Sequence, residues 1–192
     1  MEVRVATNSD IDGIAETLTS AFRNDPLWGW AFPDRSDLEA FWRFFAGSAL
    51  RYPWTFIADD FASVAVWIPP GGIELTDEEE AAMGPLIEGL IGPRASDVLK
   101  LIEAFDANHP TERPHYYLSL LGTHSSRRGN GIGMALLADN LATIDTERAP
   151  AYLESSNPAN NARYERQGFH QIGGFERPDG GAPVSAMWRD AR

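Results

Sequence analysis

Arg127-Arg128-Gly129-Asn130-Gly131-Ile132-Gly133-Met134 stands between a segment typical of a buried strand and a segment typical of an amphipathic helix. Its three alternating glycines allow a tight turn and a close approach of the backbone to a ligand. The free N–H groups of the first helical turn and the helix dipole favour an anion, and the two arginines add full positive charges. A pyrophosphate is therefore the expected ligand of this loop.

The segments on both sides of the loop predict alternating strands and helices. In chain order, a strand, a helix, a strand and a short helix are expected over residues 115–123, 134–144, 152–156 and 159–167. Residues 172–175 and 184–188 predict a final antiparallel pair of strands. This half of the chain is therefore expected to combine strands and helices in one mixed sheet.

The first half predicts a similar mixture. A strand over 3–6, helices over 11–22, 38–49, 76–91 and 94–106, and a hairpin of strands 54–58 and 63–68 are expected. Residues 25–33 carry two Trp and one Phe between turn-forming residues, which suits a loop better than a helix or strand. The predicted fold class is α+β.

Composition limits the organisation of the protein. The chain has 192 residues, 43% of them hydrophobic, enough for one domain over residues 1–192. Because there is no cysteine, a disulfide framework and a covalent cysteine intermediate are excluded. No apolar run approaches the roughly 18 to 20 residues that span a bilayer, and the polar start is unlike a secretion signal. We therefore expect a cytoplasmic protein without a membrane partner, as a monomer or homodimer.

The formal net charge of -12 argues against a nucleic-acid partner, because such binding depends on clustered Lys and Arg that neutralise phosphates. An acidic protein attracts cationic substrates, but excess acid also serves solubility. Charge alone therefore selects no substrate.

Three kinds of phosphate-binding site are compatible with a glycine-rich loop. A P-loop needs Lys-Ser/Thr after its last glycine, whereas Met134-Ala135 follows here. A dinucleotide fold needs Gly-x-Gly-x-x-Gly, a spacing that this loop lacks, although Glu154 on the next strand leaves that alternative open. The third ligand is coenzyme A.

Two motifs resemble the GCN5-related N-acetyltransferases. Arg128, Gly131 and Gly133 match the coenzyme A loop of that family, Arg/Gln-x-x-Gly-x-Gly/Ala. Its second motif, an Asn followed by a Tyr and then Gly-Phe, is matched by Asn157, Tyr164, Gly168 and Phe169. In more detail, the chain is similar to the puromycin N-acetyltransferase branch at four places: Val66-Trp67, His109-Pro110, residues 152–156 and residues 164–169.

The resemblance implies a mostly antiparallel sheet in which the fourth and fifth strands splay apart around the pantetheine arm of acetyl-CoA. It implies that backbone groups of Leu121, Gly122 and Thr123 pair with the arm, that Asn157 hydrogen-bonds it and that Tyr164 lies at the sulfur. The cofactor set is completed by Asn160, where the family often has Ala, and by the loop residues Arg127, Arg128, Gly129, Asn130, Gly131, Ile132, Gly133 and Met134.

Acetyl transfer to an amine needs a neutral nucleophile, an oxyanion stabiliser and a proton for the thiolate. Without cysteine, direct attack in a ternary complex is the simplest route. Tyr164 is the candidate acid and Glu154 the candidate base, whereas His109, His115 and His124 are weaker candidates and show no metal-ligand spacing. Alternatively, Tyr164 closes the core and Glu154 pairs with an arginine. No metal is expected.

For the acceptor amine, Asp25, Trp28, Trp30 and Trp67 are the expected pocket residues, although such aromatics also pack loops onto cores. The expected function is acetyl transfer from acetyl-CoA to a primary amine of a small molecule, for which the branch resemblance suggests an antibiotic-like nucleoside. Acetylation of a protein lysine or N-terminus, and a coenzyme A-binding module without turnover, are the alternatives.

Overall fold

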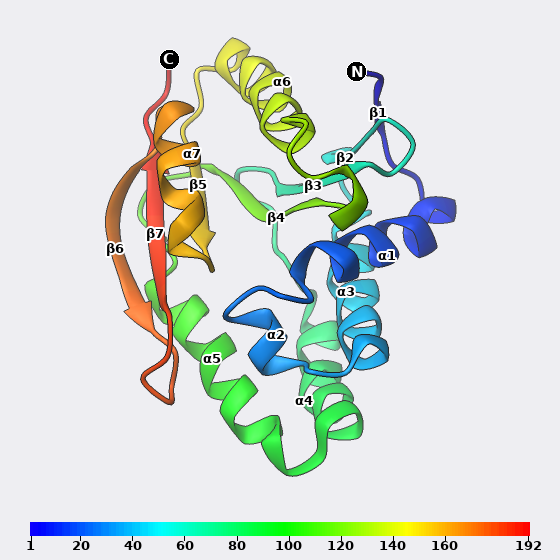
Figure 1. Ribbon diagram of the computed structural model, residues 1–192. Coiled ribbons are helices and arrows are strands. Elements are labelled where there is room, and N and C mark those ends of the chain that lie inside the picture. The colour runs from blue at the N-terminus through cyan, green and yellow to red at the C-terminus, as the bar shows by residue number, and fades with distance from the viewer.

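The computed structural model describes all residues from 1 to 192 and contains one seven-stranded sheet (Figure 1). From one edge to the other, the strands are β1 (Val3–Val5), β2 (Thr55–Ala58), β3 (Ser63–Ile68), β4 (Tyr116–Thr123), β5 (Ala151–Ser155), β7 (Pro183–Arg189) and β6 (His170–Glu176). Neighbouring strands are antiparallel except β4 and β5, which are parallel. The α+β class and the mostly antiparallel sheet are thus confirmed.

Helices cover both faces of the sheet. They are α1 (Ile11–Phe22), α2 (Trp28–Ala31), α3 (Arg35–Ala49), α4 (Asp77–Ile91), α5 (Ala95–Asn108), α6 (Ile132–Thr146) and α7 (Asn161–Arg166). The short α2 corrects the prediction of a loop over 25–33: Asp25 accepts hydrogen bonds from the N–H groups of Leu27 and Trp28 and so starts a turn of helix. A four-residue helix is too short to leave a periodic pattern.

The parallel pairing of β4 and β5 is short. Only Tyr116, Tyr117 and Leu118 are in register with β5, opposite Ala151, Tyr152 and Leu153. On its other side β4 pairs with β3, where Val66 faces Leu120 and Trp67 faces Leu118. Ser119 is therefore an extra residue, a β-bulge of the kind that bends a strand. Beyond the bulge β4 leaves β5, so the expected splay is present.

Two hydrophobic cores lie on opposite faces of this sheet. On one face, α6 packs through Leu137, Leu141 and Ile144 against β-strand residues such as Tyr116 and Leu153. On the other face, α1, α3, α4 and α5 share a larger core. Burial of these stripes is what holds the helices on the sheet, because each helix has a polar outer face.

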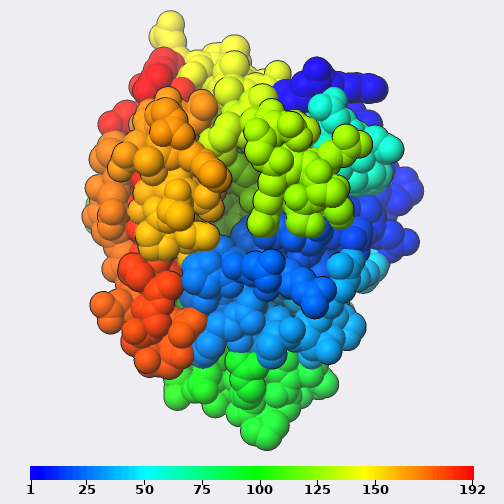
Figure 2. All heavy atoms as spheres, viewed as in Figure 1, coloured from blue at the N-terminus to red at the C-terminus, as the bar shows by residue number.

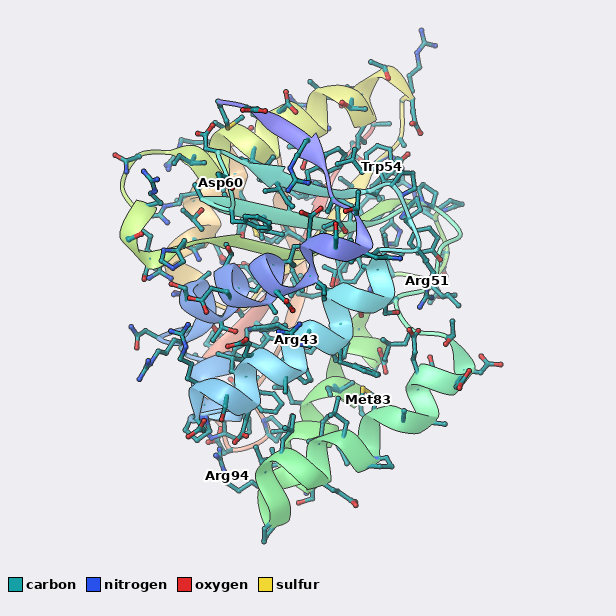
Figure 3. The ribbon with its side chains drawn as sticks, turned by 90° about the vertical axis from the view of Figure 1, so that its right-hand side faces the viewer. Arg43, Arg51, Trp54, Asp60, Met83 and Arg94 are labelled. Carbon is teal, nitrogen blue, oxygen red and sulfur yellow. The ribbon has the colours of Figure 1, made fainter.

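The two ends of the molecule differ in what they contain. Figure 3 shows Asp60, in the β2–β3 hairpin, beside the sheet in the upper part of the view, and Arg94, just before α5, near the lower end of the molecule. Met83 on α4 lies in the helical end, below the sheet. No helix has the length and apolar character needed to cross a membrane.

Candidate active site

The glycine loop joins the end of β4 to the start of α6. Gly129 and Gly131 have φ of +85° and +75°, a left-handed conformation that glycine adopts without strain. No side chain caps the first turn of α6 at Gly131, so its N–H groups are available to a ligand. Gly133 has a different role, because a Cβ there would lie 2.5 Å from Oγ1 of Thr123. This glycine lets α6 approach β4.

The two arginines of the loop are placed differently. The guanidinium of Arg128 donates a hydrogen bond to the carbonyl of Ala21, in the last turn of α1. Arg127 and the glycines beside it are exposed. Arg128 thus connects the loop to α1, and both arginines remain near the uncapped turn that attracts an anion.

A pocket lies beside the opening between β4 and β5. It is lined by 20 residues, 13 of them hydrophobic. Its aromatic walls come from α1, α2, α3, α5 and β4: Phe22, Trp28, Phe41, Trp42, Phe45, Phe105 and Tyr117. Leu121, Asn160 and Tyr164 of the expected cofactor set also line it. Figure 2 shows a recess in the surface between the segment around α7 and the glycine loop, above the segment around α2.

Glu154 lies one residue beyond the last β4–β5 pair and faces this pocket. Its side chain is 2% exposed, and neither carboxylate oxygen has a hydrogen-bond partner. The closest basic group is Nδ1 of His109, 3.6 Å from Oε1. No arginine pairs with Glu154, in contrast to the structural alternative. A buried carboxylate without donors costs free energy in the folded state, and a bound cation would offset that cost.

Two further carboxylates of the pocket were missed by the sequence analysis. Glu74, in the loop after β3, accepts a hydrogen bond from Ser119, and burial raises its pKa to about 7, with Glu154 adding repulsion. Burial also raises the pKa of Asp106 on α5. These three acids are the only charged residues of the lining. Nothing in the local sequence distinguishes Glu74 or Asp106 from surface acids, because the fold alone brings them together.

Tyr164 on α7 lines the pocket and packs near Phe169, with ring centroids 6.2 Å apart. Burial, and secondarily the charge of Asp25, raises the pKa of its phenol to about 12, so the hydroxyl stays protonated at neutral pH. Asp25 does not line the pocket. Its carboxylate accepts a hydrogen bond from the hydroxyl of Ser156, which does, and burial raises the pKa of Asp25.

Asn157 and Asn160 flank the turn between β5 and α7. The side-chain oxygen of Asn157 accepts from the N–H of Ala159 and so starts the turn. The oxygen of Asn160 accepts from Arg163. The Asn157 side chain therefore already has a structural partner at its oxygen.

Of the three tryptophans expected at the acceptor site, only Trp28 lines the pocket. Trp67 is fully buried on the α6 face, where its Nε1 donates to Oδ1 of Asn140 at 3.0 Å. The Trp30 ring contacts two arginines, with the guanidinium carbons of Arg177 and Arg94 at 4.5 Å and 5.9 Å from its centroid. Trp67 and Trp30 thus lie outside this pocket, because the side of the sheet or helix on which a residue stands decides what its side chain contacts.

No model of a protein family matches the chain. Among solved structures, one from Corynebacterium glutamicum, described as histone acetyltransferase HPA2 and related acetyltransferase, is 28% identical in sequence to this chain. The match covers 99% of this chain and 96% of that chain, with a TM-score of 0.74. Arylalkylamine N-acetyltransferase 2 from Aedes aegypti is 14% identical, with 100% and 99% covered and a TM-score of 0.70. The NatC complex bound to Gag peptide and CoA contains a chain that is 15% identical, with 100% of both covered and a TM-score of 0.56.

The fold, the β4–β5 opening and the uncapped loop, together with these similarities, define the chain as an acetyltransferase. It belongs to the superfamily of GCN5-related N-acetyltransferases, as the two sequence motifs indicated.

The raised pKa of Glu74 predicts a pH-dependent cost to folding. Between its ordinary pKa of 4.5 and its folded-state pKa of about 7, the unfolded chain loses this proton first, so stability falls as pH rises through this range. Glu74→Gln removes the effect. In urea unfolding, the free energy of unfolding of the variant, relative to that of the wild type, is expected to rise by roughly 1 kcal/mol from pH 5 to pH 8. This is less than the full effect of the pKa shift, because the Glu74 residue is partly exposed and solvent screens its charge. An identical pH dependence in Glu80→Gln and Glu74→Gln would refute the assignment.

Proposed function

We propose that the protein transfers an acetyl group from acetyl-CoA to the primary amine of a small molecule by direct attack in a ternary complex. The observation that carries this proposal is the buried, unpartnered carboxylate of Glu154, one residue beyond the point where β4 and β5 part. The glycine loop, the proposed pyrophosphate site, follows the far end of β4. A cofactor bound between them has its reactive end directed towards Glu154.

The part of β4 beyond the bulge supplies the proposed contacts to the pantetheine arm. Leu121 and Gly122 are in register with Ala65 and Val64 of β3, but they have no partner in β5. Amides of the arm can complete the hydrogen bonding of this free edge, as an added strand does. The backbone of Thr123 and the loop would continue the contact towards the pyrophosphate, with Asn157 and Asn160 on the opposite side.

The pocket supports a small, cationic acceptor with an apolar body. Its aromatic walls bind apolar groups and favour a nearby cation, and all of its charged lining residues are acidic. A carboxylate or phosphate on the acceptor would meet Glu74, Asp106 and Glu154 and be repelled. Trp42 adds a buried N–H without a partner, available to a polar atom of the ligand.

In the proposed reaction, Glu154 takes a proton from the incoming ammonium, and the amine nitrogen then attacks the thioester carbon. As the C–S bond breaks, the thiolate receives a hydrogen bond from the Tyr164 hydroxyl. A phenol with a pKa of about 12 is a weaker acid than a thiol near 8.5, so Tyr164 shares its proton and does not lose it outright. The proton that finally reaches the sulfur comes from the attacking nitrogen.

The protein-acetylating alternative needs an open groove for an extended chain. The acceptor pocket is instead lined by side chains of α2, α3 and α5, most of them aromatic. This arrangement supports a small molecule. A module that binds coenzyme A without turnover would keep the same loop but release no thiol.

Acetyl-CoA binding is the first prediction. Calorimetry on the purified protein is expected to detect acetyl-CoA, and Arg128→Ala is expected to weaken it by about 1 to 3 kcal/mol because a charge-assisted contact to the pyrophosphate is lost. Lys100→Ala, which removes an exposed positive charge on α5, serves as control. Absence of binding, or tighter binding of NAD, would overturn the proposal.

Turnover is expected to depend on both proposed residues. Glu154→Gln should lower the rate at neutral pH by about 100-fold or more, and the remaining rate should rise steeply with pH, since the amine must then arrive neutral. Tyr164→Phe should lower kcat by roughly 10- to 100-fold, because the thiolate loses one hydrogen bond. Thiol release with a primary amine measures both, with exposed Glu165→Gln as control. Unchanged rates would place the base or the donor elsewhere.

Acceptor selectivity is the third prediction. 2-Phenylethylamine and phenylalanine share one skeleton and differ by a carboxylate, which the acidic pocket repels. We expect kcat/KM for the amine to be larger by a factor on the order of 100. In Glu74→Gln the ratio should fall. Equal rates for the two compounds in the wild type would contradict the cationic acceptor, while leaving acetyl transfer intact.

A further inference from the structure

Two histidines lie behind Glu154. His109 directly follows α5, and His115 directly precedes β4. Their ring centroids are 5.1 Å apart, and both rings pack edge-on against Tyr152, at 5.0 Å and 5.5 Å. His115 is 9% exposed, whereas the side chain of His109 is 29% exposed. The ring next to the buried carboxylate, His109, is therefore the one that reaches solvent.

The backbone determines which nitrogens of these rings carry hydrogen. Nδ1 of His115 lies 2.7 Å from the carbonyl oxygen of Arg113. A carbonyl only accepts, so Nδ1 of His115 must be the donor. Burial lowers the pKa of His115 and keeps the ring neutral, which leaves a lone pair on its Nε2.

The position of the hydrogen on His109 follows from its contact with His115. Nε2 of His109 lies 3.2 Å from Nε2 of His115 and must donate to that lone pair. A neutral His109 then has its own lone pair on Nδ1, the atom 3.6 Å from Oε1 of Glu154. Two acceptors thus face each other, and neither carboxylate oxygen of Glu154 has a hydrogen-bond partner. The hydroxyls of Tyr117 and Tyr152 lie near the carboxylate, and burial, together with its charge, raises the pKa of both phenols, so they stay protonated. One proton is missing between the carboxylate and Nδ1 of His109.

We propose that the missing proton is the one that the acceptor ammonium brings: Glu154 receives it and passes it to Nδ1 of His109, while His115 holds His109 in the receptive tautomer. This inference rests on the proposed function. The charges balance, because one ammonium loses one proton, Glu154 returns to a carboxylate and His109 becomes an imidazolium. Its exposed edge then returns the proton to water.

Three acidic side chains lie near His109. Glu154 on β5, Glu74 in the loop after β3 and Asp106 on α5 all interact with its charge. The remaining neighbours are the neutral rings of Tyr117, Tyr152 and His115. The relay cannot continue through His115, since its Nδ1 ends on a backbone carbonyl that takes no proton. His115 is accordingly a positioning residue, and the proton leaves from His109.

The tautomers can be tested without substrate. Long-range ¹H–¹⁵N spectra of the ¹⁵N-histidine-labelled protein distinguish the two neutral forms, and His109→Phe and His115→Phe assign the signals. We expect the Nδ1–H form for His115 and the Nε2–H form for His109. An Nε2–H form for His115, or an Nδ1–H form or an imidazolium for His109 at neutral pH, would overturn the proposal even if the enzyme is active.

Kinetics test the role in turnover. His115→Phe keeps the ring shape but removes the acceptor, whereas the side-chain oxygen of His115→Gln can still accept from His109. We expect the Phe variant to lose about tenfold or more in kcat, with an altered pH profile and an unchanged KM for acetyl-CoA, and the Gln variant to recover much of the rate. Equal rates in both variants and an unchanged pH profile would assign His115 a structural role only.

A second variant keeps the test decisive if the phenylalanine variants fold poorly. His109→Ala should lose about 10- to 100-fold in kcat, and added imidazole should restore part of the rate, since the site is open to solvent. No rescue, with thermal stability maintained, would refute the relay. A wild type that releases no thiol with any amine would refute the proposed function instead, while the spectra would still decide the tautomers.

Discussion

The bulge at Ser119 is the constraint on which the site depends. One extra residue in β4 ends its pairing with β5 after three residue pairs and leaves the backbone edge beyond it free. A single uninterrupted sheet would close this space, because its inter-strand hydrogen bonds would be complete. The bulged residue also contributes its hydroxyl to Glu74. The same irregularity thus opens the proposed cofactor site and fixes an acid of the proposed acceptor pocket.

The carboxylates of the pocket show how function opposes stability here. Glu154 is buried without donors, and Glu74 has a single donor and a raised pKa. Such groups cost free energy in the unliganded fold, whereas electrostatic interactions with a bound cation are strengthened by the apolar surroundings. Aromatic packing on the same face offsets the cost, as in the contacts of Trp28 with Trp42 and Phe105.

The sequence predicted the features that depend on local pattern. The glycine loop, the strand over 63–68 and the capped start of α4 at Thr76 are read from spacing and turn chemistry, and the structure has each of them. Features decided by tertiary register were not accessible. Trp67 and Tyr117 are both strand aromatics, yet Trp67 faces α6 and Tyr117 lines the pocket. Likewise, the meeting of Glu74, Asp106 and His109 depends on how three separate segments pack, which no local pattern encodes.

Strand alternation explains why the titratable groups gather on one face. His115, directly before β4, and Tyr117 on β4 are two residues apart, as Tyr152 and Glu154 are on β5, and Tyr117 is in register with Tyr152. With a period of two, these four side chains share a face, while Tyr116, Leu118 and Leu153 turn to α6. His115 therefore stands one residue before the first β4–β5 pair and Glu154 one residue after the last. The three β4–β5 residue pairs before the bulge therefore set the distance between His115 and Glu154, and His109 lies between these two side chains and contacts both.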